Sequence, residues 1–129
     1  MKTLLILVVL LFSFSVFAEN WIEFGSNNDG TTNTIMYVDY DQVDKRNGYL
    51  NIVTLFDFSP KINRVIGSLK FLKRYDCDDF KTKLLRTIYY KDQMGKGDVY
   101  DDDSENEGWE YLMPDSNEYA LLEIFCSKF

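Results

Sequence analysis

The stretch NGYLNIVTLFDF, residues 47–58, predicts a tight turn followed by the central strand of a β-sheet. Asn47-Gly48 is the pair favoured in a type I′ hairpin turn, because both central residues of that turn need positive φ. After the turn, every second side chain falls on one face, which carries Leu50, Ile52, Thr54, Phe56 and Phe58. The other face, with Tyr49, Val53 and Leu55, is also largely apolar, so we expect the strand to be covered on both sides.

Further strands are predicted on either side of this one. A turn-rich loop around Asp29-Gly30 precedes it, and residues 59–67 (SPKINRVIG) are interpreted as a loop that follows it. Together these signals predict an antiparallel sheet of about six strands. The other expected strands lie over residues 20–26, from Thr34 towards the turn, over 68–77 and 80–90, within 97–103 and over 109–113.

The alternation in residues 68–90 separates apolar from basic side chains. In the strand at 68–77, Leu69, Phe71, Tyr75 and Cys77 lie on one face and Lys70 and Arg74 on the other. In the strand at 80–90, Phe80, Leu84, Ile88 and Tyr90 oppose Lys81, Lys83 and Tyr89, and Leu85-Arg86 interrupts the pattern. We therefore predict a partner-binding basic face made of Lys70, Arg74, Lys81 and Lys83. The alternative is an ordinary solvated face whose charges are balanced by acids on neighbouring elements.

The C-terminal segment changes from a strand pattern to a helix pattern. The residues PDS, 114–116, are typical of a helix start. Tyr119, Leu122 and Cys126 then recur at the spacing of one helix side. We expect a helix over about residues 117–128 that packs on one face of the sheet, because each has an apolar face to bury.

The chain begins with the features of a secretory signal peptide. Lys2 supplies the positive start, Leu4 to Phe17 is almost wholly apolar, and small residues at the end place a cleavage site after Ala18. The apolar run of 14 residues is shorter than the roughly 20 that span a bilayer. A lipid-anchored bacterial precursor would carry a cysteine at the cleavage site, where this chain has Glu19. We expect residues 19–129 to form a single exported domain, periplasmic or secreted, with a surface location left open.

Cys77 and Cys126 are the only cysteines in the chain. An even number in an oxidising compartment favours a disulfide, and the alternatives are two buried thiols or a reactive nucleophile. The nucleophile would lack its usual base, because the chain has no histidine. The prediction is therefore an α+β domain in which a disulfide ties the C-terminal helix to the sheet.

The net charge of −7, which becomes −8 without Lys2, argues against generic binding to nucleic acid or to anionic membranes. The charge is unevenly distributed along the chain. Residues 61–96 contain ten Lys or Arg and four Asp, whereas the flanking segments are acidic. The basic middle segment is therefore compatible with a binding face for an acidic partner.

The sequence offers little for catalysis. Because it has no histidine, the chain has neither a Ser-His-Asp nor a Cys-His arrangement, and it lacks the most common metal ligand. The acidic loop at residues 101–107 lacks the glycine and the final glutamate of a calcium loop, because Leu112 stands at the twelfth position. We read it as a solvated loop, with weak divalent binding as the alternative. We assign no catalytic residue, metal or cofactor and expect that the protein is not an enzyme. The alternative is a small hydrolase that acts through Asp101 and Asp103.

The chain resembles the bacterial surface-adhesin protein E family over nearly all of residues 19–129. The matching features are Trp21, YVD at 37–39, LFDF at 55–58, RYDC at 74–77, KLLRTIYY at 83–90, MGKGDV at 94–99, Trp109, MPDS at 113–116 and Cys126. The resemblance implies a curved antiparallel sheet with a C-terminal helix held on one face by Cys77 and Cys126. It also implies adhesion to host matrix or serum proteins and formation of a homodimer.

Two functional hypotheses follow. The first is a non-catalytic exported adhesin that binds a protein partner through the basic and aromatic central strands. The second is a soluble periplasmic accessory or structural module with an endogenous envelope partner.

Overall fold

The computed structural model describes residues 19–104 and 108–129, and these residues form one antiparallel sheet and one α-helix. The predicted leader at 1–18 and part of the acidic loop therefore lie outside the described residues. In chain order the elements are β1 (Trp21–Asn28), β2 (Asn33–Asp39), the 3₁₀ turn η1 (Tyr40–Gln42), β3 (Asp44–Arg46), β4 (Tyr49–Ile62), β5 (Ile66–Asp76), β6 (Lys81–Tyr90), the 3₁₀ turn η2 (Gln93–Gly95), β7 (Val99–Asp103), β8 (Glu110–Tyr111) and α2 (Asn117–Lys128).

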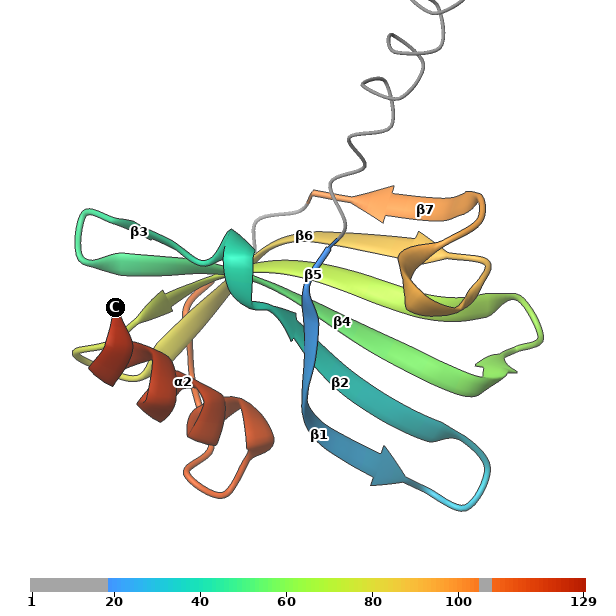
Figure 1. Ribbon diagram of the computed structural model, residues 1–129, viewed down its shortest axis with the longest axis horizontal. Helices are drawn as coiled ribbons and strands as arrows, with labels where there is room; N and C mark the ends of the chain where they lie inside the picture. The colour runs from blue at the N-terminus through green and yellow to red at the C-terminus, as the bar shows by residue number, and fades with distance from the viewer. Residues whose placement is uncertain (1–18, 105–107) are drawn as a thin grey trace, which may run out of the picture.

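The sheet runs in the order β1-β2-β4-β5-β6-β7, with β3 paired to β4 and β8 paired to β6. Six strands therefore form the continuous sheet, as the sequence predicts, and two short strands extend it. Strand β4 is central, between β2 and β5, and Asn47 and Gly48 both have positive φ in the turn before it. Figure 1 shows β1 and β7 at opposite edges and α2 packed near β1.

Helix α2 covers one face of the sheet, which we call the helix face. Leu121, Leu122 and Phe125 of α2 pack in one buried cluster with Ile52 and Tyr75. The Ser116 side chain caps the helix by accepting a hydrogen bond from the Tyr119 amide, at 3.1 Å. The Cys77–Cys126 disulfide joins α2 to the end of β5, which confirms the predicted tether.

The opposite face of the sheet is covered at one end by the loop that carries η2. The Met94 amide donates to the Asp57 carboxylate at 2.8 Å, and the Gly95 amide donates to the Ser68 hydroxyl at 2.9 Å. Leu55 is completely buried beneath this loop, near Gly95. Strand β4 is thus covered on both sides, as predicted.

The interpretation of residues 59–67 as a loop is wrong. Strand β4 continues to Ile62 and β5 begins at Ile66, so the turn occupies only the three residues between them. Asn63 and Arg64 both have positive φ there. Pro60 is compatible with the strand because it lies where the β4–β5 pairing is interrupted, between Asp57 and Ile62, so its missing amide costs no ladder bond.

The predicted faces of β6 are correct only before Leu85. Leu72 and Lys73 of β5 pair with Arg86 and Leu84, so Leu85 is an extra residue in a β-bulge. The bulge exchanges the faces that follow it. Ile88 and Tyr90 therefore lie on the same face as Lys83, and Tyr89 lies on the helix face.

Candidate functional site

The four residues of the predicted basic face, Lys70, Arg74, Lys81 and Lys83, lie together on the face opposite α2. Arg74 of β5 pairs with Lys83 of β6. Lys81 lies two residues before Lys83, on the same side of β6. Residues paired across an antiparallel ladder share a face, and side chains alternate along each strand. Because Tyr75 belongs to the core beneath α2, its neighbour Arg74 must point to the other side.

Two of the four cations have acidic neighbours. The Lys70 ammonium lies 2.8 Å from the Glu19 carboxylate and also over the rings of Trp21 and Tyr90, with centroids 5.6 and 5.5 Å away. The Lys81 ammonium lies 3.5 Å from the Asp79 carboxylate and 3.9 Å from that of Asp76. The positive charge of these two residues is therefore partly balanced within the chain.

Arg74 and Lys83 form no ion pair with any residue in the described ranges. Arg74 instead donates from Nε to the Asn51 side-chain oxygen, at 3.1 Å. The Lys83 ammonium lies over Trp109, 5.9 Å from the ring centroid. These two residues are adjacent across the β5–β6 ladder, so they form the positive centre of the basic face.

Trp109 is the aromatic centre of this face and was not among its predicted residues. It contacts the Lys81 ammonium at 5.4 Å from the ring centroid, as well as Lys83. Its ring also packs against Tyr49, with centroids 5.5 Å apart, and both aromatic residues remain 36% exposed. Tryptophan, tyrosine and arginine are the residues that dominate binding energy at protein interfaces.

An apolar groove continues the basic face towards η2. Val53, Leu72 and Ile88 line a hollow of about 130 Å³ that is flanked by Lys70 and Arg86. Arg86 is bound to Asp102 of β7, with 2.9 Å between Nε and Oδ1. This hydrogen bond lowers the pKa of the Asp102 carboxyl and raises the pKa of the Arg86 guanidinium.

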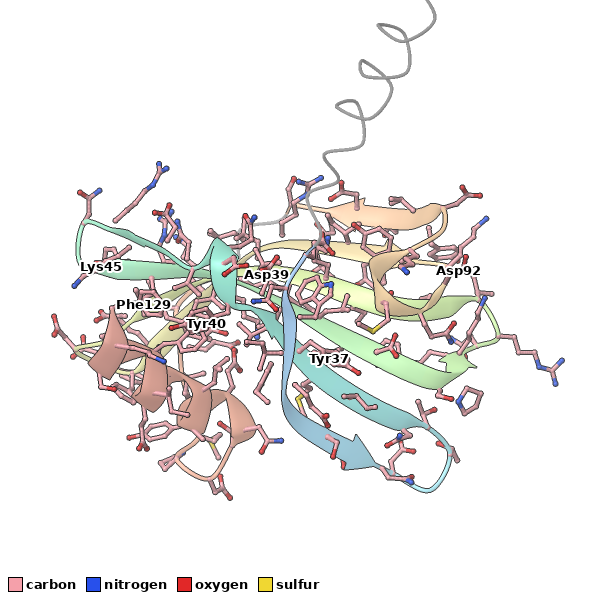
Figure 2. The ribbon with its side chains drawn as sticks, in the orientation of Figure 1. Tyr37, Asp39, Tyr40, Lys45, Asp92 and Phe129 are labelled. Atoms are coloured by element: carbon pink, nitrogen blue, oxygen red, sulfur yellow. A yellow bond between two sulfur atoms is a disulfide. The ribbon has the colours of Figure 1, made fainter. Side chains whose placement is uncertain are left out.

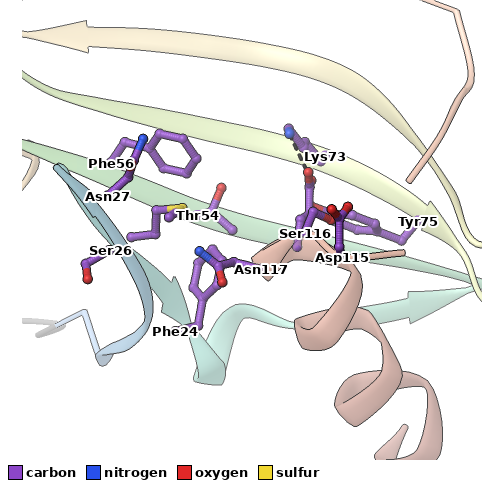
Figure 3. A pocket seen from close by; sticks show the side chains of 12 residues that line it. Phe24, Ser26, Asn27, Thr54, Phe56, Lys73, Tyr75, Asp115, Ser116 and Asn117 are labelled. Atoms are coloured by element: carbon purple, nitrogen blue, oxygen red, sulfur yellow. Dashed lines mark hydrogen bonds and ion pairs between the residues drawn. The ribbon is translucent and has the colours of Figure 1, made fainter. Parts of the chain in front are cut away.

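A second hollow, of about 400 Å³, lies on the helix face between β1 and the start of α2 (Figure 3). The Lys73 ammonium donates to the Glu118 carboxylate at 2.9 Å, and the Tyr75 hydroxyl donates to the same oxygen. Burial raises the pKa of the Tyr75 hydroxyl well above its usual value, and the Glu118 charge adds to this. Both donors thus help to hold the first turn of α2 against the sheet.

The two aspartates of the hydrolase hypothesis lie at the surface. Asp101 and Asp103 belong to the edge strand β7, and both are exposed. Neither lines the two hollows described above. Within the described ranges, no three histidine, cysteine, aspartate or glutamate side chains gather closely enough to hold a metal ion. Residues 105–107 of the acidic loop lie outside those ranges, so the calcium-loop alternative stays untested.

None of the helices in the described part of the chain is long and apolar enough to cross a membrane.

Comparison with known proteins identifies relatives by sequence profile and by fold. The family model described as "Surface-adhesin protein E" matches residues 21–127. A structure of Haemophilus influenzae protein E superposes with a TM-score of 0.65 at 17% identity, covering 89% of each chain. A second crystal form of protein E gives a TM-score of 0.61 at 18% identity, covering 73% of this chain and 81% of that one. No curated protein matches the chain by sequence. The shared fold confirms the expected sheet with its C-terminal helix.

Proposed function

This chain belongs to the surface-adhesin protein E family, and we propose that it is an exported, non-catalytic protein that binds a protein partner through the basic face. The observation that carries the proposal is the grouping of Arg74 and Lys83 beside Trp109, on the face of the sheet that α2 leaves uncovered. The family's name supports adhesion as the role. Host matrix or serum proteins are the proposed partners.

The composition of the face supports a protein rather than a small molecule as the ligand. Trp109 and Tyr49 form a rigid, half-exposed platform, and Arg74 adds a planar donor group beside it. Such a platform binds through burial of aromatic surface, while unpaired cations around it select an acidic partner. The groove at Leu72 and Ile88 offers a neighbouring place for an apolar side chain of that partner.

The direct test measures binding of the chain from Glu19 onward to a panel of matrix and serum proteins by surface plasmon resonance. Reversing both charges, Arg74→Glu with Lys83→Glu, should weaken binding at least about tenfold. The matched control is Arg64→Glu with Lys96→Glu, which changes the net charge equally. These two residues are exposed and lie away from Trp109, in the β4–β5 turn and beside η2.

Two results would overturn the proposal. One is an unaltered protein that binds no better than a heat-denatured sample across the panel. The other is an equal loss of affinity in both charge-reversed variants, which would mean that net charge, and not the basic face, controls binding. Light scattering on the same preparations tests whether the protein forms the homodimer that the family resemblance implies.

The second candidate is a soluble periplasmic module that uses the same face for an endogenous envelope protein. The observation that favours it is Glu19 at the predicted cleavage site, where a lipid anchor would need cysteine. Protease treatment of intact cells, compared with periplasm released by osmotic shock, separates the two candidates. Digestion on intact cells supports the adhesin, and protection until the outer membrane is opened supports the periplasmic module.

A further inference from the structure

Asp39 is a buried carboxylate without a cationic partner in the described part of the chain. It ends β2, is 2% exposed, and its Oδ1 atom receives no hydrogen bond from any described residue. Burying a charged carboxylate that is not fully paired is costly. A buried carboxyl in a native fold is therefore either protonated or paired with a positive charge.

The surroundings of Asp39 favour a cation. The backbone amides of Asn20 and Asp41 face its carboxylate, whereas the side chains of Glu19 and Asp41 bring negative charge near it. Burial, and then these two carboxylates, raise the pKa of the Asp39 carboxyl, against the effect of the two amides. Figure 2 places Asp39 beside η1, close to where β1 begins.

The chain just before β1 is held in place beside Asp39. The Glu19 carboxylate accepts a hydrogen bond from the Trp21 indole at 2.9 Å and pairs with the Lys70 ammonium at 2.8 Å. The Asn20 backbone carbonyl accepts a hydrogen bond from the Tyr40 amide at 3.4 Å. Trp21 is the ladder partner of Asp39. The backbone nitrogen of Glu19 precedes that of Asn20 by one residue, a span of at most about 3.6 Å.

We propose that the Asp39 carboxylate is a binding site for the α-ammonium group of the mature chain. The proposal rests on the predicted cleavage after Ala18. Hydrolysis of that peptide bond adds a hydroxyl to the Ala18 carbonyl carbon and leaves a primary amine on Glu19. This amine takes a proton from water below its pKa of about 8. Processing thereby replaces a neutral amide by a cation next to the buried carboxylate.

The consequence is a domain whose charge balance is completed by its own export. Before cleavage, ionisation of Asp39 lowers the stability of the fold, so stability is gained as pH falls through its raised pKa. After cleavage, the pKa of the Glu19 amine is raised in the folded state. Its contribution to stability is complete below about pH 8 and is lost as pH rises through the raised value. The two forms should therefore respond to pH in different ranges.

The experiment is a double-mutant cycle on the complete domain. One protein begins at Glu19, released from a fusion partner without extra residues, and the other carries Gly-Ser before Glu19. Asp39→Asn, which keeps an acceptor for the two amides, is made in both. We expect the substitution to lower the melting temperature by at least about 5 °C in the first protein and by less than about 1 °C in the second.

A second readout does not depend on stability. Acylation of the α-amine at neutral pH requires the unprotonated form, so the rate at Glu19 should be at least about tenfold lower in the folded protein than in an unfolded peptide with the same start. Asp39→Asn should restore the rate. Asp41→Asn, which changes an exposed carboxylate on the neighbouring η1, is the matched control and should leave most of the protection.

Three outcomes would overturn the proposal. The first is an equal effect of Asp39→Asn on both proteins, which indicates a purely structural carboxylate. The second is an α-amine that titrates at the ordinary value of about 8 in the folded, unsubstituted protein, a test that holds even where Asp39→Asn does not fold. The third is a mature chain, identified by mass spectrometry of exported material, that does not begin at Glu19.

Discussion

On the helix face of the sheet, apolar side chains such as Ile52 meet Leu122 and are excluded from water, whereas on the opposite face Lys83 stays near the surface beside Trp109. The helix face also carries the disulfide and the buried cluster of α2, so its residues are committed to folding. The opposite face is covered by η2 at one end, and the rest of it presents charged and aromatic side chains beside the apolar groove of Val53, Leu72 and Ile88. The two faces of one sheet thus separate the residues that stabilise the fold from the proposed binding surface.

This division predicts which substitutions should change stability alone and which should change binding alone. Changes on the helix face should lower the free energy of unfolding and leave the affinity of the folded protein unchanged. Changes on the basic face should weaken binding and leave the free energy of unfolding nearly unchanged.

The largest expected effect comes from removing the disulfide. Cys77 and Cys126 are 49 residues apart, and a loop of that length is worth about 4 kcal/mol of unfolding free energy in the chain-entropy model. The double substitution to alanine should therefore shift the urea midpoint strongly while preserving partner affinity below the transition. A loss smaller than about 1 kcal/mol would show that α2 is held by packing alone.

The next effect compares two sides of α2. Leu122 is 1% exposed within the core, so Leu122→Ala should cost about 3 kcal/mol in unfolding free energy. Ile124 lies on the same helix but is 57% exposed, and Ile124→Ala should change stability by less than about 0.5 kcal/mol. Urea denaturation of both variants provides the measurement. Similar losses in the two variants would contradict the assignment of the buried side.

Much of this architecture could be predicted from the sequence, because its signals are local. The helix at 117–128 follows from a cap and a periodicity that lie within one segment, and the hairpin before β4 follows from Asn47-Gly48. The grouping of Lys70 with Arg74 on one face follows from strict alternation along a single strand. The disulfide could be predicted from the number of cysteines and the oxidising compartment alone.

The parts that escaped prediction depend on contacts between distant segments. Lys73 lies in the same basic run as Arg74, yet it pairs with Glu118, 45 residues further on, because its strand position points it towards α2. Trp109 joins the basic face through the pairing of β8 with β6, which no local pattern specifies. The bulge at Leu85 was visible as a broken alternation, but its effect on Ile88 required the register with β5.

A smaller effect is expected from Tyr75→Phe on the helix face. The substitution keeps the buried ring and removes the hydroxyl that donates to Glu118, which should cost about 2 kcal/mol, as for a hydrogen bond to a charged group. Because burial raises the pKa of the Tyr75 hydroxyl, the unsubstituted protein should lose stability as pH rises above about 10, where the unfolded chain ionises first. Denaturation curves at pH 8 and pH 10.5 should show that this alkaline loss is smaller in the phenylalanine variant.

The smallest effect on stability, and the sharpest test of the division, comes from comparing two lysines on adjacent strands. Lys83 is half-buried on the basic face, and no described residue forms an ion pair with it. Lys83→Ala should therefore change the unfolding free energy by no more than about 0.5 kcal/mol. Lys73→Ala removes the ion pair with Glu118 across the helix face and should cost about 1 kcal/mol.

Partner binding should rank the same two variants in the opposite order. Lys83→Ala removes a cation from beside Trp109, within the proposed contact surface, and should weaken affinity about threefold to tenfold. Lys73→Ala should leave affinity unchanged, because its ammonium is directed to Glu118 and away from that surface. Surface plasmon resonance and denaturation on the same preparations give both orders at once. If Lys73→Ala weakened binding as much as Lys83→Ala did, recognition would extend to the helix face and the proposed division of the sheet would fail.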